Sequence, residues 1–278
     1  SNPSHPRLHI VRYAIDSAVL PLVTETLPVA EAVRRGLMGA YGRCMWKQLY
    51  GNQTYPTESA LRPKSAIFSG KDTSGAPLEG HRHAYYLPTD EDEDGHLDHV
   101  TVYAADGFGL DEQKAFDRLR ELHTGRGSEE HHPLRLLLLG MGLSKEYDPG
   151  PLREAKSWVS ATPYIATRHA KTRGRDRIEI ASPEDCARFL MEDLRAQLTN
   201  VRPNVAGGGG TEVAIEPLWD SNHVFTIADK WRPIQFKRFR RKASDNGGRR
   251  LSGSFLLTFN HAVKGPVALG WSSHFGMG

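Results

Sequence analysis

Two histidines separated by one residue are the side chains of this sequence best suited to acid–base chemistry. His81 and His83 stand at the start of a predicted strand, two residues apart and so on one face of it. Lys71 lies upstream in a polar, glycine-bearing loop. An imidazole with an ordinary pKa of about 6.5 can take up and release a proton near neutrality. The pair is therefore a candidate general base and acid; a zinc-ligand pair and loop histidines without a role are the alternatives.

Basic residues gather in the second half of the chain. Residues 151–278 contain 20 basic and 12 acidic residues, a net charge of +8, whereas residues 1–150 carry −5 within an overall charge of +3. Two basic clusters, 168–175 and 236–242, favour a polyphosphate partner such as nucleic acid; a solvated face is the alternative. The expected contacts are Arg168, His169, Lys171, Arg173, Arg175, Lys237, Arg238, Arg240, Arg241 and Lys242.

Aromatic residues accompany the second cluster. Trp231, Phe236 and Phe239 could stack on bases or fill a core. If the segment is extended, Phe236 and Arg238 share one face with Arg240, and Phe239 lies on the other with Lys237 and Arg241. Each face then mixes charge with an aromatic ring, as on an exposed hairpin that contacts nucleic acid.

The C-terminal residues form a glycine-rich loop directly after a predicted strand. Gly270, Gly276 and Gly278 follow a Gly-x5-Gly-x-Gly spacing, with His274 between them. Glycines let backbone N–H groups crowd toward a phosphate, so these residues are further candidate contacts; a simple turn is the alternative.

An acidic turn matches the first nine positions of a calcium loop, D-x-D-x-D-G-x-x-D. The candidate ligands are Asp90, Asp92, Asp94 and Asp98, but position twelve is Thr101 in place of a bidentate glutamate. The two interpretations are a plain acidic turn and a weak, structural calcium site.

His99 and Thr101 also match the His-x-Thr signature of two-histidine phosphoesterases, although no second His-x-Thr or His-x-Ser occurs in the other half.

Hydrophobic periodicity predicts an α+β protein with two tandem ferredoxin-like domains, residues 1–150 and 151–278. In the first half, strands at 8–19, 83–87, 97–104 and 135–139 and helices at 28–46 and 111–122 give the order β-α-β-β-α-β. In the second, a strand at 157–165, a helix at 183–198 with its N-cap at Ser182, and a strand at 212–218 begin another such unit. Segments 234–242 and 254–259 are expected to pair as a hairpin, and 267–269 to end the regular structure.

Composition narrows the class of protein. Of the 278 residues, 38% are hydrophobic and 25% charged, which is typical of a folded, soluble protein. The longest apolar run, 134–143, is about half the length of a bilayer span, so no membrane helix is expected. Two cysteines and no secretory signal pattern favour a cytoplasmic location.

The glycine loop, the duplicated element order and four short stretches together carry a family resemblance. The stretches are 69–72 (SGKD), 80–84 (GHRHA), 98–103 (DHVTVY) and 158–164 (WVSATPY). With these features the chain resembles the Cas-six-like repeat endoribonuclease part of the Cas-five/Cas-six fusion protein of type I-U (I-G) CRISPR systems, within the RAMP superfamily. The usual fusion also has an N-terminal Cas-five-like domain, for which too little chain is present, so a fragment of a longer fusion is expected.

The resemblance implies binding of a CRISPR repeat RNA stem-loop and its cleavage by attack of an RNA 2′-hydroxyl, giving a 2′,3′-cyclic phosphate. No metal cofactor is required, and other subunits of a type I effector complex are expected partners. The reaction needs a base, an acid and a cationic group. His81, His83 and Lys71 are the expected catalytic residues, with His169 and His274 as reserves. The alternatives are a non-catalytic guide-RNA-binding subunit of an effector complex and a small-molecule phosphoesterase.

Overall fold

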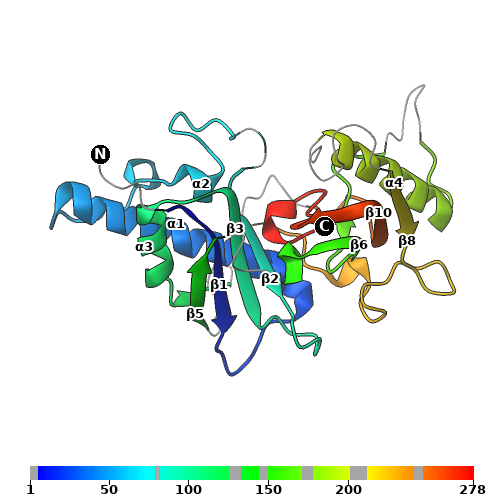
Figure 1. Ribbon diagram of the computed structural model, residues 1–278, viewed down its shortest axis with the longest axis horizontal. Helices are drawn as coiled ribbons and strands as arrows, with labels where there is room; N and C mark the ends of the chain where they lie inside the picture. The colour runs from blue at the N-terminus through cyan, green and yellow to red at the C-terminus, as the bar shows by residue number, and fades with distance from the viewer. Residues whose placement is uncertain are drawn as a thin grey trace. The chain divides into compact units, whose positions relative to one another are not determined.

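The computed structural model has an α+β fold in two compact units, one formed by residues 1–23 and 28–148 and the other by residues 24–27 and 149–278 (Figure 1). The structure describes residues 6–78, 80, 82–124, 133–143, 150–170, 178–200, 212–240 and 247–278. No helix in these ranges is both long enough and apolar enough to cross a membrane.

The first unit contains a five-stranded antiparallel sheet in the order β2-β3-β1-β5-β4. Its elements along the chain are β1 (Leu8–Ile15), α1 (Thr26–Tyr50), α2 (Ala66–Ser69), β2 (Tyr85–Thr89), β3 (His99–Phe108), α3 (Leu110–Arg118), β4 (Glu121–Leu122) and β5 (Leu134–Gly142). With the two short elements α2 and β4 set aside, the order is β-α-β-β-α-β. The predicted ferredoxin-like arrangement of this half is therefore confirmed.

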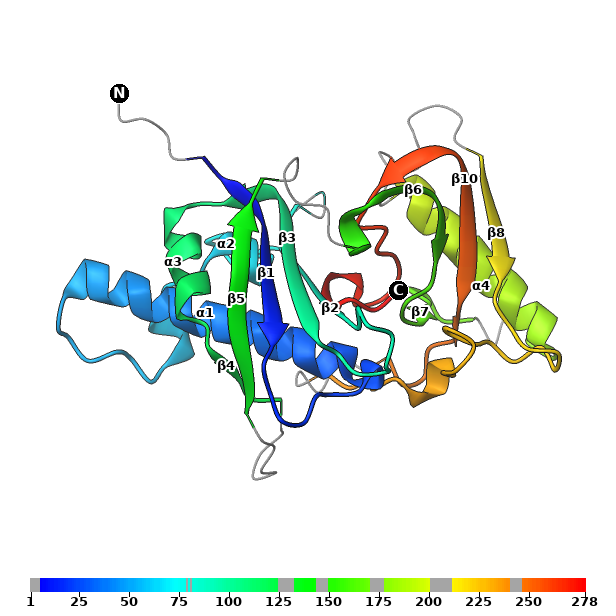
Figure 2. The ribbon, with the colours of Figure 1, turned by 60° about the horizontal axis from the view of Figure 1, so that its bottom comes forward.

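Helices α1 and α3 lie on the same face of this sheet (Figure 2). Apolar side chains of alternating strand residues meet them, and the Tyr13 hydroxyl of β1 donates to the Phe116 carbonyl of α3 at 2.8 Å. The rings of Phe108 and Phe116 pack edge to face, with centroids 4.8 Å apart, and Phe68 of α2 packs on Phe116 at 5.3 Å. This packing fixes α2 and the loop that follows it.

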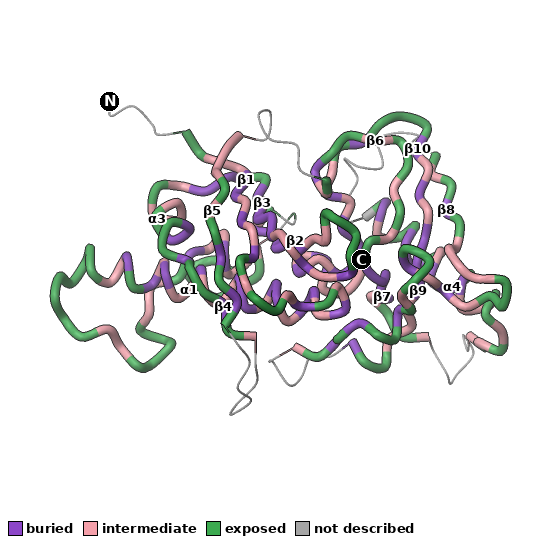
Figure 3. Tube along the Cα trace, turned by 90° about the horizontal axis from the view of Figure 1, so that it is seen from below, coloured by how far each residue is buried: buried purple, intermediate pink, exposed green. Residues whose placement is uncertain are grey.

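The second unit repeats the first four elements of that order. Strands β6 (Glu154–Val159), β8 (Val213–Pro217) and β10 (Phe255–Lys264) form an antiparallel sheet in the order β6-β10-β8, and α4 (Pro183–Asn200) follows β6. One face of the sheet packs on the apolar side of α4. The buried residues of this core include Phe189, Leu190, Leu194, Leu198, Ile215, Phe255, Leu257 and Phe259. In Figure 3 the strands of both units carry buried stretches, drawn in purple.

Three predictions for the second unit are wrong. The expected strand at 157–165 is broken into β6 and β7 (Tyr164–Ile165), which pairs with β9 (Ser252–Gly253). In the described part of segment 234–242, residues 234–240 form no hairpin with 254–259, because β10 instead pairs with β6 and β8. Residues 265–278, all described, contain one short 3-10 helix (Ser273–Phe275) and no strand. By contrast, the predicted N-cap is confirmed, since the Ser182 hydroxyl accepts from the Asp185 N–H at 3.1 Å.

Candidate nucleic-acid interface

Residues 236–240 of the second unit are extended and alternate between buried and exposed side chains. They follow a short 3-10 helix (Pro233–Gln235). Phe236 is buried at 3% exposure, whereas Phe239 is 60% exposed and the Lys237 side chain 53% exposed. The alternation expected from the sequence thus places one aromatic ring in the core and one in solvent. Phe239 and Lys237 form the outward face of this segment.

The neighbouring cations are held by local contacts. The Lys237 ammonium pairs with Glu25, and the Lys237 N–H donates to the Thr24 carbonyl at 2.8 Å. The Arg240 guanidinium lies over the ring of Phe275, 4.6 Å from its centroid. Arg241 and Lys242, the last predicted contacts of this cluster, lie outside the described residues.

Arg238 is an internal structural residue. It is only 9% exposed, and its guanidinium donates to the Pro233 carbonyl at 2.6 Å, the Ser252 hydroxyl at 2.7 Å and the Arg250 carbonyl at 3.3 Å. Burial lowers the pKa of Arg238. Because its hydrogen bonds are directed into the protein, Arg238 holds the basic segment in place, in contrast to the exposed contact expected from the sequence.

Replacing Arg238 by methionine should therefore lower the stability of the second unit. The long side chain is retained, but two backbone carbonyls lose their charged donor in a buried site, which costs about 1–3 kcal/mol. Urea unfolding measures the loss. Arg195→Met on the exposed side of α4 is the matched control and should change stability little. Equal stabilities of the two variants would contradict this role for Arg238.

The other predicted basic cluster begins with an arginine whose charge is balanced. Arg168 lies 3.4 Å from the Asp193 carboxylate and 3.5 Å from Glu192, and its guanidinium stacks over Phe189 at 4.7 Å. His169 is exposed beside it. Lys171, Arg173 and Arg175 lie outside the described residues, so their contacts with nucleic acid stay predictions.

Asp193 anchors this segment and was missed by the sequence reasoning. It is 2% exposed and accepts hydrogen bonds from the Tyr164 hydroxyl at 2.7 Å, the Thr167 N–H at 2.8 Å and the Thr167 hydroxyl at 2.9 Å. On the opposite side, Arg250 donates to the Thr167 carbonyl at 2.6 Å. The available signal was an aspartate between Leu190 and Leu194 in the apolar stripe of a helix.

The C-terminal glycines are required by close packing. Gly270, Gly276 and Gly278 all have positive φ angles, and a β-carbon at Gly278 would lie 1.7 Å from the Leu269 carbonyl oxygen. The Gly276 N–H donates to the Ser273 carbonyl at 3.2 Å and the Gly278 N–H to the Thr162 hydroxyl at 2.9 Å. Both N–H groups thus have acceptors within the protein, and phosphate binding by the loop, including His274, stays a prediction.

The structure brings the Lys71 loop against His83. Gly70, which ends α2 with a φ of 69°, packs on the imidazole so closely that a β-carbon there would lie 3.2 Å from Nδ1. Arg34 fixes α2 by donating to the carbonyls of Phe68 at 3.1 Å and Ser69 at 2.9 Å. Lys71, the candidate catalytic lysine, therefore comes directly after Gly70 in the chain, and Gly70 is in contact with His83, the candidate catalytic histidine.

His83 precedes the strand that was expected to contain it. Strand β2 begins at Tyr85, and the His83 ring lies parallel to the Tyr85 ring with centroids 6.5 Å apart. Arg82 points elsewhere, donating to Asp106 at 2.6 Å. His81 lies outside the described residues, so the same-face arrangement of the two histidines stays a prediction.

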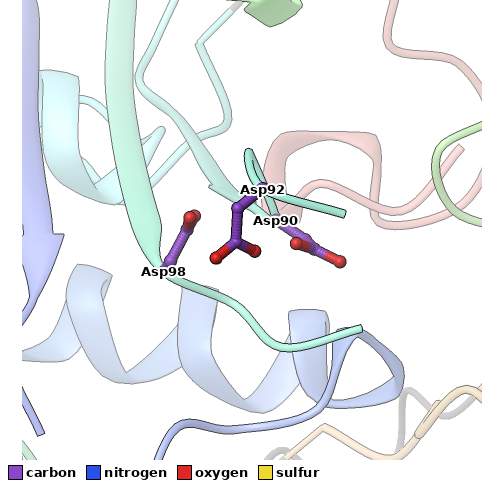
Figure 4. A group of neighbouring side chains, drawn as sticks. All are labelled: Asp90, Asp92 and Asp98. Atoms are coloured by element: carbon purple, nitrogen blue, oxygen red, sulfur yellow. The ribbon is translucent and has the colours of Figure 1, made fainter. Parts of the chain in front are cut away.

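Three of the four predicted calcium ligands converge. Ligand oxygens of Asp90, Asp92 and Asp98 lie within 4.8 Å of one another, with Asp92 between the other two (Figure 4). Asp94 instead accepts from the N–H of His96 at 2.7 Å. Burial raises the pKa of Asp90, and neighbouring Asp92 raises it further, against the opposing hydrogen bond from Gly95. A cation would relieve this crowding of carboxylates.

Calcium binding by this turn is therefore testable through Asp90. Because the folded-state pKa of Asp90 is raised, the cation-free protein should lose stability as the pH rises through that pKa, and Asp90→Asn should raise the melting temperature in EDTA. Given the weak affinity that Thr101 implies, 10 mM calcium should raise the wild-type melting temperature by about 2–4 °C and leave Asp90→Asn unchanged. An equal calcium-induced change in the melting temperatures of both proteins would show that the segment is a plain acidic turn.

The His-x-Thr pair offers no accessible hydroxyl. Thr101 is fully buried on β3, and the His99 Nδ1 contacts the Asp98 carboxylate at 2.9 Å. A phosphoesterase would need the threonine hydroxyl at its substrate. The geometry does not favour that class.

Comparisons with known proteins give one similar structure. No family model matches the sequence, and no curated protein matches it. A solved structure described as "CRISPR associated protein Cas6" has 9% sequence identity and a TM-score of 0.44, with 98% of each chain covered. A likeness at this level does not establish a shared fold or function. The function is therefore argued from the residues of this chain.

Proposed function

We propose that this protein binds a CRISPR repeat RNA stem-loop and cleaves it without a metal cofactor. The observation that carries the proposal is the outward face of residues 236–240, where exposed Phe239 lies between cationic residues on a segment anchored by buried Arg238. Single-stranded RNA is bound by such combinations, because a base stacks on the aromatic ring while cations hold the phosphates. The sequence resemblance to repeat endoribonucleases supplies the substrate class.

The proposed reaction uses the 2′-hydroxyl of the RNA as its nucleophile. A base removes the hydroxyl proton, the 2′-oxygen forms a bond to the adjacent phosphorus, and the bond to the 5′-oxygen breaks as that oxygen gains a proton. The product ends in a 2′,3′-cyclic phosphate. His83 and His81 are the proposed proton-transfer residues, and Lys71 would stabilise the negative charge that develops on the phosphate.

Incubation with end-labelled repeat RNA in EDTA tests the proposal. We expect retention of the hairpin together with cleavage to a cyclic phosphate. Retention without cleavage would indicate the non-catalytic guide-RNA-binding subunit, which we expect to need the same basic segment. If the protein neither retains nor cleaves the hairpin, the proposal is overturned. Phosphoesterase activity on small 2′,3′-cyclic phosphates would then be assayed. Association with other subunits of an effector complex is a separate proposal, tested by co-purification.

A further inference from the structure

The last turns of α1 and the chain that leads from them toward α2 form a basic tip of the first unit. This end of α1 extends beyond α3 and the sheet (Figures 1 and 2). Residues 43–64, the α1 tip, contain four basic residues and one acidic residue, whereas acidic residues are in excess over residues 1–150. Arg43, Lys47 and Lys64 are exposed, and none of them forms an ion pair with a residue that the structure describes. The positive charge of the tip is therefore available to a partner.

Contacts within the α1 tip hold it in one shape. The Trp46 indole packs on the Tyr50 ring with centroids 4.2 Å apart and meets the Tyr55 ring edge to face at 6.1 Å. The Arg62 guanidinium lies 5.4 Å from the centroid of the Tyr55 ring and donates to the Thr57 carbonyl at 2.6 Å. None of these five residues is fully buried. The contacts thus order a surface rather than a core, and an ordered surface loses little conformational entropy when it binds.

Aliphatic side chains are exposed on this ordered tip. Leu49 is 60% exposed and Leu61 is 61% exposed. An aliphatic side chain gives an RNA base no ring on which to stack, and the rings of Trp46 and Tyr55 contact other groups of the tip. Exposed leucine beside lysine and arginine is suited instead to a protein surface that presents apolar and acidic side chains together.

A surface of that kind lies at the other end of α1. The Leu97 N–H of the acidic turn donates to the Pro21 carbonyl at 2.7 Å, which holds the turn against the residues that lead into α1. Val19 is 68% exposed there and Leu22 is 41% exposed. The turn contributes six acidic residues and no lysine or arginine. Residues 19–22 and 90–98 together form the acidic end of the first unit.

The negative charge of the acidic end is only partly balanced within the unit. Glu91 pairs with Arg12. Asp92 and Glu93 are exposed, and neither forms an ion pair with any residue in the described ranges. Two carboxylates at the outer part of the turn can therefore pair with cations of another molecule.

We propose that copies of this protein associate head to tail, with the α1 tip of one copy bound to the acidic end of the next. The two surfaces carry opposite charge, and each also exposes apolar side chains, so they are complementary in both respects. Helix α1 has 25 residues and is about 37 Å long, so one copy cannot bring its own two surfaces together. Because the two surfaces differ, the contact is heterologous, and copies add until a ring closes. The proposal goes beyond the proposed function and does not depend on RNA cleavage.

Sedimentation velocity of the full chain in EDTA, without RNA, tests the association. We expect the average sedimentation coefficient to rise with protein concentration at about 0.05 M salt and to fall to the monomer value at about 1 M salt, where charges are screened beyond about 3 Å. The tip variant Arg43→Glu, Lys47→Glu should stay monomeric at low salt. The acidic-end variant Asp92→Lys, Glu93→Lys should do the same. A monomeric wild type at every concentration and salt would overturn the proposal, as would undiminished association of either variant.

A mixture of the two variants separates specific pairing from damage to the fold. All four replaced side chains are exposed, so both variants should melt close to the wild-type temperature. In an equimolar mixture, the reversed tip of one variant meets the reversed acidic end of the other, and the two unchanged surfaces also match. Association should therefore return to near the wild-type level. A mixture that stays monomeric would overturn the pairing of these two surfaces.

The apolar part of the contact is tested separately. Leu49→Ser and Leu61→Ser together should weaken association about 10-fold or more, because both side chains lose their burial in the contact. Leu137→Ser is the matched control, since Leu137 is 58% exposed on β5 of the same unit, and it should associate like the wild type. Loss of association in Leu137→Ser alone would assign the contact to β5 and overturn the proposal.

RNA is the other occupant that these experiments can reveal. If the tip variant loses hairpin affinity but associates like the wild type, the α1 tip binds RNA and the proposal is overturned. A wild type that associates in the predicted way but neither binds nor cuts the hairpin would support this inference, although the proposed function would then have failed.

Discussion

Alanine at position 83 should lower the rate of RNA cleavage by about 100- to 10,000-fold while hairpin affinity changes by no more than a few-fold. His83→Ala removes a proton-transfer group in the first unit but none of the basic residues of the second unit, so chemistry and binding separate. His81→Ala should behave in the same way. Single-turnover cleavage and filter binding of the same labelled hairpin measure the two effects.

His9→Ala is a suitable control for these variants. His9 is a half-buried histidine of β1 whose Nδ1 lies 3.2 Å from the Ala104 carbonyl, and it is assigned no role in the reaction. It should cleave at close to the wild-type rate. Wild-type rates for both His83→Ala and His81→Ala would transfer the proton-transfer roles to His169 or His274 and leave the binding proposal intact.

Replacement of Lys237, Phe239 and Arg240 together should give the largest loss of RNA affinity. Removal of a base-stacking ring costs about 1–3 kcal/mol, roughly 5- to 150-fold in affinity. Each lost phosphate contact should also reduce the slope of log affinity against log salt by about 0.7 to 0.9. The variant Lys237→Gln, Phe239→Ala, Arg240→Gln spares Arg238, whose loss would disturb the fold.

Fluorescence anisotropy over a salt series measures both quantities. Lys156→Gln, which removes an exposed lysine of β6 in the same unit, is the matched control and should leave the salt slope almost unchanged. An unchanged affinity and slope in the triple variant would exclude residues 236–240 as the RNA-binding surface. A loss of affinity with an unchanged slope would assign the binding to Phe239 alone.

The first unit was predictable because local pattern and tertiary structure agree there. Its strands are rich in apolar residues, its helices carry apolar residues at helical spacing, and consecutive elements pack on one another. The acidic turn was recognisable for a similar reason, since the D-x-D-x-D-G order is local. Its inward oxygens are those of Asp90, Asp92 and Asp98, and only the fold shows that Asp94 turns toward His96.

The second unit was less predictable for two reasons. Its paired strands are far apart in the sequence, and the pattern of its basic segment, residues 236–240, fits more than one structure. Strand β10 pairs with β6, so that Leu257 lies opposite Trp158, and no turn signal encodes a contact across so much chain. The alternation at 236–240 resembles a strand, but the segment lies against the protein through Phe236 and Arg238 without joining a sheet. Charge alone gave no means to distinguish buried Arg238 from exposed Lys237.

The most direct test of the central claim replaces the attacking group of the RNA. Once the cleavage position has been mapped, a hairpin with a single 2′-deoxy nucleotide at that position is incubated with the protein in EDTA beside the all-ribose hairpin. Attack by the 2′-hydroxyl predicts that the deoxy hairpin binds with unchanged affinity and stays intact, while the ribose hairpin is cut to a 2′,3′-cyclic phosphate. Cleavage of the deoxy hairpin at the same position would contradict the account, because water would then be the nucleophile.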